Sequence, residues 1–235
     1  MAQRTKTVPR STLDRIDSAV TAFDSVRTRL DPTAAGLVEQ LKVAEGLAEY
    51  IHFIKYRIKD SDHLREKLIR KAKLDLAADR EFSITDRNVF SKITDLIGIR
   101  ILHLHSQQFP RMHDALLAFF GEQRLKVVGK PFAICWDSEY QQFYREVGLS
   151  VRVDSSMYTS VHYVVELNQA AKYRCEVQVR TLMDEVWGEV SHTVNYPTSS
   201  PSDICGDQLR VLARLTSGCV RLVDSIFKTD SQARE

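Results

Sequence analysis

The sequence has few cysteines and no long apolar run. Its four cysteines, Cys135, Cys175, Cys205 and Cys219, are scattered without a C-x-x-C pair, so we expect reduced thiols, as in a cytoplasmic protein. No stretch is apolar enough to cross a membrane, and no signal peptide is expected. The phosphate-binding patterns G-x-x-x-x-G-K-[ST] and G-x-G-x-x-G are also absent, which argues against P-loop enzymes and kinases.

A strong net charge is missing too. The 33 Lys and Arg residues nearly balance the 31 Asp and Glu residues, leaving +2, so any polyanion-binding function must be local. The one strongly basic stretch is 55–73, which has eight Lys and Arg residues against three acids. Cations spread over one side of a helix would suit a triphosphate. A solvated basic face is the competing interpretation, and it is favoured for this stretch alone.

The stretch 173–181 alternates between two kinds of side chain. One face carries Cys175, Val177 and Val179. The other face carries Arg174, Glu176, Gln178 and Arg180. This alternation predicts a half-buried strand with one carboxylate among cations. An exposed edge strand with a fortuitous charge row fits the segment equally well.

A helix is expected directly after this strand. Thr181 and Asp184 have the spacing of an N-cap pair. The apolar stripe of the helix is expected to consist of Leu182, Met183, Val186, Trp187 and Val190. The opposite side would carry Glu185, Glu189 and His192.

The spacing of apolar residues predicts the other elements. Amphipathic helices are expected at 11–30, 32–56, 107–120, 137–146 and 203–227. Asp31 and Pro32 would separate the first two, as N-cap and first helical residue. Strands are expected at 97–104, at 125–136 with a break at Gly129, and as a hairpin-like pair within 151–167. The last helix would pack on the domain or on a second subunit.

Several polar residues fall where a nucleotide could bind. Tyr158, Ser160 and His162 share the polar side of one expected strand, where an exposed aromatic ring could stack on a base. A tyrosine partly buried under its loop is the alternative. Asp95 and Glu176 are acids at strand positions with Arg100, Arg174 and Arg180 nearby. Paired carboxylates that can share Mg²⁺, together with arginines, are typical of phosphoryl transfer between nucleotides.

Four motifs in order make the chain resemble the synthetase domain of the RelA/SpoT family, particularly the small single-domain alarmone synthetases. Arg57-x-Lys59, followed by Lys67 and Arg70, is similar to the ATP-binding segment of that family. The run 94–100, TDLIGIR, is similar to [TS]-D-x-x-G-x-R, and 158–162, YTSVH, resembles the guanosine loop Y-x-S-x-H. The run 176–192 resembles E-[IV]-Q-[IV]-R-T with a downstream W-x-x-x-x-H.

The resemblance implies an α+β fold with a mixed five-stranded sheet flanked by helices, as in nucleotidyltransferases. It implies an N-terminal helical extension at 1–48, a synthetase domain at 49–197 and a C-terminal helix at 198–235. The implied reaction moves the β,γ-pyrophosphate of ATP to the 3′-hydroxyl of GDP or GTP, giving (p)ppGpp and AMP. The expected partners are therefore ATP and GDP or GTP, without a membrane, and the terminal helices would serve for homo-oligomer formation.

The resemblance also implies a role for each site residue. Arg57 and Arg100 would flank the adenine. Lys59, Lys67 and Arg70 would hold the ATP phosphates. Asp95 and Glu176 would be the catalytic acids and Mg²⁺ ligands, with Glu176 as candidate base. The acceptor would be bound by Tyr158, Ser160, His162, Gln178 and Arg180, with His192 bracing the site.

One departure from the family pattern leaves the acceptor open. The family usually has a lysine and a glycine just before the loop tyrosine, and this chain has Asp154-Ser155-Ser156-Met157. Losing that cation weakens the case for a guanosine di- or triphosphate. Pyrophosphorylation of the tRNA 3′-end or of an adenosine nucleotide is one alternative. A catalytically silent nucleotide-binding module is another.

Overall fold

One mixed sheet runs through the part of the chain that the structure describes. The computed structural model describes residues 7–168, 172–195 and 202–234. The strands are β1 (Phe53–Ile58), β2 (Ile97–His103), β3 (Lys126–Val127), β4 (Phe132–Ile134), β5 (Ser150–Arg152), β6 (Ser160–Asn168) and β7 (Tyr173–Thr181). Their order is β1-β2-β7-β6-β4-β5, and β3 pairs with β6. The pairs β2–β7 and β4–β5 are parallel and the others antiparallel. The expected α+β class is confirmed.

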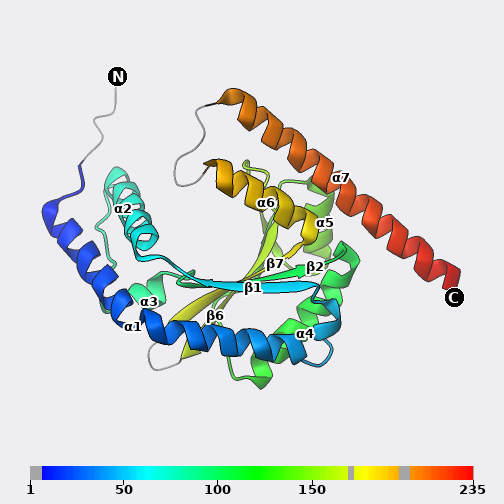
Figure 1. The fold of residues 1–235 in the computed structure, drawn as a ribbon. Helices are drawn as coiled ribbons and strands as arrows, with labels where there is room; N and C mark the ends of the chain where they lie inside the picture. The colour runs from blue at the N-terminus through cyan, green and yellow to red at the C-terminus, as the bar shows by residue number, and fades with distance from the viewer. Residues whose placement is uncertain (1–6, 169–171, 196–201, 235) are drawn as a thin grey trace.

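Helices cover both faces of this sheet (Figure 1). They are α1 (Arg10–Val43), α2 (Ser61–Ala77), α3 (Val89–Lys92), α4 (Phe109–Glu122), α5 (Ser138–Glu146), α6 (Leu182–Asn195) and α7 (Asp203–Arg234), with short 3₁₀ turns at Ala48–Tyr50 and Ser106–Gln108. α1 and α4 lie on one face, and α6 lies on the other. The buried Cys175, Val177 and Val179 of β7 join one core with α1 and α4, so the half-buried strand is confirmed.

The sheet has seven strands where five were expected. One additional strand is β1, which lies where the end of a helix was expected. The other arises because Gly129, with φ +76°, divides the expected strand 125–136 into the short strands β3 and β4. The hairpin-like pair expected within 151–167 is also wrong. β5 pairs with β4, which lies between β5 and β6, so the intervening loop crosses over β4 instead of closing a hairpin.

α1 is one continuous helix that contains Pro32, so the expected break at this residue is wrong. An interior proline costs a helix about 3 kcal/mol. Leu30, Leu37 and Leu41 continue the buried face that begins at Ile16, and burying each such side chain contributes about 1.5–3 kcal/mol. The uninterrupted apolar face therefore outweighs the proline. The expected second helix is also too long, because its last residues form β1, paired with β2.

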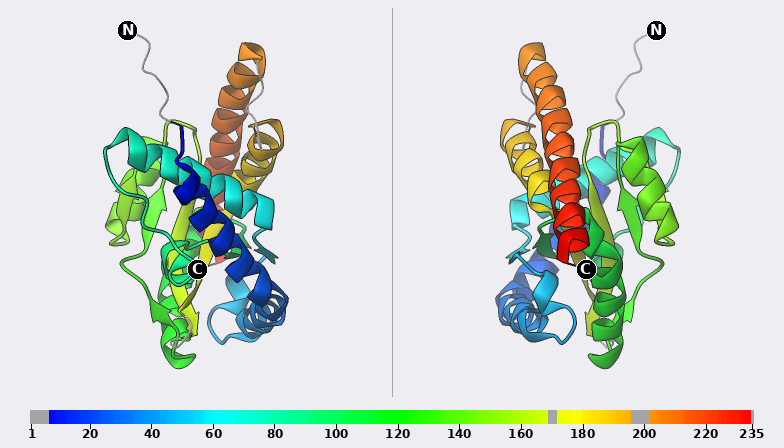
Figure 2. Two further views of the ribbon diagram at one scale, coloured as in Figure 1. Left: turned by 90° about the vertical axis from the view of Figure 1, so that its left-hand side faces the viewer. Right: turned by 90° about the vertical axis from the view of Figure 1, so that its right-hand side faces the viewer.

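α7 packs along α6 on the outside of the molecule (Figure 2). The Trp187 indole Nε1 on α6 donates a hydrogen bond to the Leu209 carbonyl on α7 at 3.0 Å. Arg221 of α7 pairs with Asp137 at 2.6 Å. The last helix thus packs on the domain, and contact with a second copy stays a prediction. The boundary expected at 197/198 falls outside the described residues. None of the described helices has the length and apolar character needed to cross a membrane.

Candidate active site

The strand register places two rows of polar residues on the face of the sheet beneath α6. Gly98 of β2 lies between Arg57 of β1 and Glu176 of β7. One row further, Arg100 lies between Lys55 and Gln178. Because Gly98 has no side chain, the space above it between Arg57 and Glu176 stays open. A cavity of about 230 Å³ opens here, lined by Lys55, Tyr56, Arg57, Asp95, Gly98, Arg100, Glu176, Gln178, Glu189 and His192.

A second, more basic hollow of about 300 Å³ adjoins the first. It is lined by Arg57, Ile58, Lys59, Asp60, His63, Glu66, Lys67, Arg70, Asp95 and His192. Helix α2 borders this hollow. Asp60 is the N-cap of α2, because its side chain accepts hydrogen bonds from the first backbone N–H groups of the helix. Leu64, Leu68 and Ala72 bury one face of α2, which leaves Lys67 and Arg70 on the hollow. The two hollows share Arg57, Asp95 and His192.

Asp95 sits at the junction of the hollows between two ammonium groups. Its carboxylate oxygens lie 2.8 Å from Lys59 Nζ and 2.7 Å from Lys67 Nζ. Burial alone would raise the pKa of Asp95, but the two lysines outweigh it and hold the pKa at about 2. Burial lowers the pKa of Lys59, and Asp95 offsets only part of that change. Asp95 is therefore ionised throughout the neutral range.

Glu176 is the second acid of the first cavity. It accepts a hydrogen bond from Gln178 Nε2 at 2.8 Å and lies 3.3 Å from His162 Nδ1. Burial tends to raise the pKa of Glu176, but the contacts with His162 and Gln178 lower it by more, so that the pKa lies below its ordinary value. The negative charge of Asp95 acts in the opposite sense and tends to raise the pKa of Glu176.

Among the described residues, no group of three or more His, Cys, Asp or Glu is arranged to hold a metal unaided. A magnesium ion in a phosphotransferase usually takes only one or two carboxylates and completes its shell with phosphate oxygens and water. Asp95 and Glu176 are ionised oxygen donors on one cavity. The donor set therefore fits Mg²⁺ bound together with a nucleotide.

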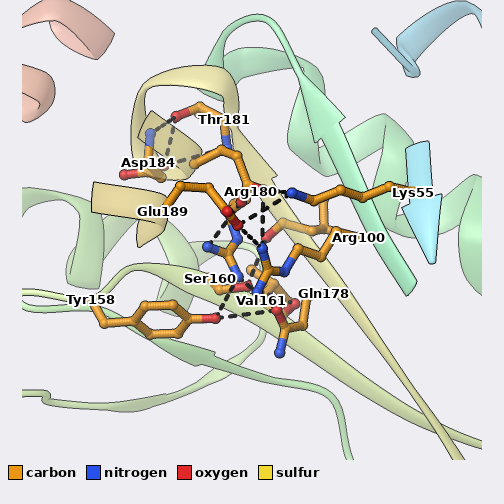
Figure 3. Close-up of polar contacts among 12 residues, drawn as sticks. Lys55, Arg100, Tyr158, Ser160, Val161, Gln178, Arg180, Thr181, Asp184 and Glu189 are labelled. Carbon is orange, nitrogen blue, oxygen red and sulfur yellow. Dashed lines mark hydrogen bonds and ion pairs between the residues drawn. The ribbon is translucent and has the colours of Figure 1, made fainter. Parts of the chain in front are cut away.

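Helix α6 closes the first cavity with charged residues. Glu189 pairs with Arg100 and with Lys55, the latter at 3.2 Å (Figure 3). Burial tends to raise the pKa of Glu189, but Lys55 and Arg100 bring it down to about 2. The expected apolar stripe on α6 is right for the buried Trp187 but wrong for Val186 and Val190, which are 48% and 41% exposed, while Glu185 is buried. The capping pair at the helix start is confirmed, with Asp184 N donating to Thr181 Oγ1 at 3.1 Å.

The residues expected to bind the acceptor lie beside the cavity, and most do not line it. Gln178 lines the first cavity. Arg180 is 2% exposed and donates hydrogen bonds to the Tyr158 hydroxyl at 2.8 Å and to Gln178 Oε1 at 2.6 Å (Figure 3). The Arg180 guanidinium covers the Tyr158 ring at 4.9 Å, so the partly buried arrangement of this tyrosine holds here. Ser160 is fully buried, and His162 stacks on Phe132.

Sequence reasoning missed three residues at this site. Lys55 would have been found if β1 had been recognised as a strand, because alternation places it on the same face as Arg57. Glu185 was expected on the polar side of α6, without a partner. Gly188 carries no local signal, yet a Cβ at this position would lie 2.6 Å from Arg180 Nη1.

Comparisons with known proteins agree with this arrangement. A family model described as "Region found in RelA / SpoT proteins" matches residues 56–201. A GTP pyrophosphokinase family protein from Streptococcus pneumoniae is 18% identical, with a TM-score of 0.57, and the match covers 96% of this chain and 97% of that one. The sequence matches no curated protein.

Two structures of the small alarmone synthetase 1 from Bacillus subtilis are also similar. One is 18% identical with a TM-score of 0.58, and the match covers 87% of this chain and 97% of that one. The other is bound to its product pppGpp and is 18% identical with a TM-score of 0.52, covering 97% of this chain and 100% of that one. At this identity the structural likeness concerns the fold.

Proposed function

The chain belongs to the RelA/SpoT family, and from this premise we propose that it transfers the pyrophosphate of ATP to the 3′-hydroxyl of GDP or GTP, releasing AMP. The observation that carries the proposal is the pair of adjoining hollows with Asp95 at their junction. One hollow is rich in cations and suits phosphates, and the other contains the second acid, Glu176. Pyrophosphate transfer needs these two environments side by side.

The ATP side is assigned to the basic hollow and to the arginines of the sheet. Lys59, Lys67 and Arg70 would bind the phosphates, because ammonium and guanidinium groups are good donors to phosphate oxygens. Arg57 and Arg100 would flank the adenine. This assignment is supported by Arg57 lining both hollows, so that one nucleotide can extend from the first into the second.

The acceptor side is assigned to β7 and to the loop before β6. Glu176 would take the proton of the attacking 3′-hydroxyl, and Gln178 would orient that carboxylate through their hydrogen bond. Tyr158 and Arg180 would bind the acceptor nucleoside, with Ser160, His162 and His192 supporting the site. Mg²⁺ held by Asp95 and Glu176 would supply charge neutralisation on the transferred phosphates. Catalysis of this kind depends mainly on positioning and electrostatics.

A different acceptor is the second candidate, and one observation favours it. The loop before Tyr158 carries Asp154 where relatives usually have a cation nearby. Met157 adopts a φ of +67°, a left-handed conformation that glycine adopts more easily. The loop therefore keeps a glycine-like backbone without the positive charge. A less basic loop is compatible with the 3′-end of tRNA or with an adenosine nucleotide as acceptor. The tRNA end carries no di- or triphosphate and would need the missing charge least.

An acceptor panel tests the proposal. The protein is incubated with labelled ATP, Mg²⁺ and one of GDP, GTP, ADP, unlabelled ATP or deacylated tRNA. We expect AMP and a 3′-pyrophosphorylated guanosine nucleotide, and no product when EDTA removes the divalent cation. Label on tRNA or on an adenosine nucleotide alone would establish the second candidate. If no acceptor is converted, the chain is a silent nucleotide-binding module, an outcome that the retained Asp95 and Glu176 argue against.

A further inference from the structure

Glu185 is a buried carboxylate that contacts cations from three strands. It is 7% exposed and lies in the first turn of α6. Its oxygens are 2.7 Å from Lys55 Nζ on β1, 3.1 Å from Arg100 Nη1 on β2 and 3.0 Å from Arg180 Nη1 on β7. Buried ion pairs contribute little net stability, because desolvation of the charges offsets their attraction. A cluster of this kind therefore calls for an explanation other than stability.

The contacts of Glu185 lead to both substrate sides of the proposed reaction. On the ATP side, Lys55 and Arg100 line the first cavity. On the acceptor side, Arg180 donates to Tyr158 and to Gln178. Glu189 is connected only to the ATP side, since it contacts Lys55 and Arg100. Within the described residues, Glu185 is the only acid paired with Arg180.

The glycine at position 188 leaves room for the contact between Arg180 and Glu185. Gly188 lies one turn after Glu185 on α6, and a Cβ there would approach Arg180 Nη1 to 2.6 Å. No real side chain tolerates that separation, so a residue other than glycine would displace the guanidinium group. Gly188 leaves the space that Arg180 Nη1 occupies. The carboxylate of Glu185 holds this end of the guanidinium group, while Tyr158 and Gln178 accept hydrogen bonds from Nη2.

We propose that Glu185 is a positioning residue that holds the Arg100 and Arg180 guanidinium groups in one arrangement and so couples the ATP side of the site to the acceptor side. The inference rests on the proposed function for the identity of the two substrates. The positioning of the two arginines by Glu185 is independent of the proposed function, because the order of their side chains can be measured without any substrate.

The test compares Glu185→Gln with Glu189→Gln, a matched variant on the same helix face. Nuclear magnetic resonance of the arginine side-chain Nε–H groups reports their order in the nucleotide-free protein. We expect the Arg100 and Arg180 signals both to broaden or shift in Glu185→Gln. In Glu189→Gln only the Arg100 signal should change. Unchanged Arg180 signals in Glu185→Gln would overturn the inference.

Calorimetry with a non-hydrolysable ATP analogue and with GDP gives the functional consequence. Glu185→Gln should weaken binding of both nucleotides by about tenfold, the scale of one charged hydrogen bond. Glu189→Gln should weaken only the ATP analogue. Loss of affinity for a single nucleotide in Glu185→Gln would overturn the coupling. Failure of the wild-type protein to bind either nucleotide would instead refute the proposed function, while the resonance comparison would still decide the role of Glu185.

Gly188→Ala perturbs the same contact without removing a charge. Alanine is favoured over glycine in a helix, so this variant is expected to fold even if Glu185→Gln does not. Displacement of Arg180 should weaken GDP binding about tenfold and leave the ATP analogue unaffected. Wild-type affinity for GDP, with an unchanged Arg180 signal, would overturn the inference.

Discussion

Lys67 on α2 lies 2.7 Å from the carboxylate of Asp95 at the entrance of β2. This ion pair joins the most basic helix of the chain to the sheet, and Lys59 binds the second carboxylate oxygen. The acid is thereby kept ionised and fixed at the boundary between the two hollows. The carboxylate is therefore ionised at the position where we propose that it binds Mg²⁺ together with a nucleotide.

The Asp95 pairing should appear in the acid stability of the protein. The pKa of Asp95 is about 2 instead of 3.8, so its contribution to the free energy of unfolding is complete above pH 3.8 and is lost as the pH falls through about 2. The contribution is about 2 kcal/mol. Urea denaturation from about pH 5 down to about pH 2 should therefore show the difference between wild type and Asp95→Asn shrinking by that amount. A difference that stays constant would contradict the pairing.

Glu176→Gln should separate binding from chemistry. The amide keeps the shape of the side chain and can still contact Gln178, but it cannot accept the proton of a 3′-hydroxyl. We expect the affinity for an ATP analogue to change little, while turnover falls by about a hundredfold or more, as for loss of a general base. Calorimetry and single-turnover assays measure the two effects. Glu146→Gln, an exposed residue on α5, is the control, and retained turnover in Glu176→Gln would remove Glu176 from the mechanism.

The parts of the fold that could be predicted are those determined by neighbouring residues. The alternation of Cys175, Val177 and Val179 identified β7, because a strand at the middle of a sheet must bury one complete face. The capping pair of Thr181 and Asp184 was equally local. Asp95 and Glu176 both line the first cavity, and their roles as metal ligands and catalytic acids stay a prediction.

The parts that could not be predicted depend on contacts distant in sequence. β1 looked like the end of a helix, because its strand conformation comes from pairing with β2, which lies about forty residues later. The burial of Glu185 depends on cations from three strands, and no periodicity within α6 reveals them. The same holds for Gly188, whose small size matters only because Arg180 lies against it.

The four cysteines should differ in reactivity according to their positions. Cys135 and Cys175 are buried, while Cys219 is exposed and Cys205 is intermediate. Burial raises the pKa of the Cys135 thiol to about 11 and raises the pKa of the Cys175 thiol as well, so little thiolate forms at neutral pH. A thiol reagent should modify two cysteines in the native protein and all four in denaturant. Rapid modification of Cys175 in the native protein would contradict the placement of β7 in the core.

The contact between α6 and α7 should contribute measurably to stability. In Trp187→Phe the hydrogen bond to the Leu209 carbonyl is lost, which costs about 1 kcal/mol, and the smaller ring leaves a space between the helices that adds a further cost of about 1 kcal/mol. Urea denaturation followed by circular dichroism should therefore show a free energy of unfolding about 2 kcal/mol lower. Val190→Ala on the same helix is the control, because Val190 is 41% exposed and its truncation should change stability by less than about 0.5 kcal/mol. Equal stability of Trp187→Phe and wild type would mean that α7 is not held against α6 through this residue.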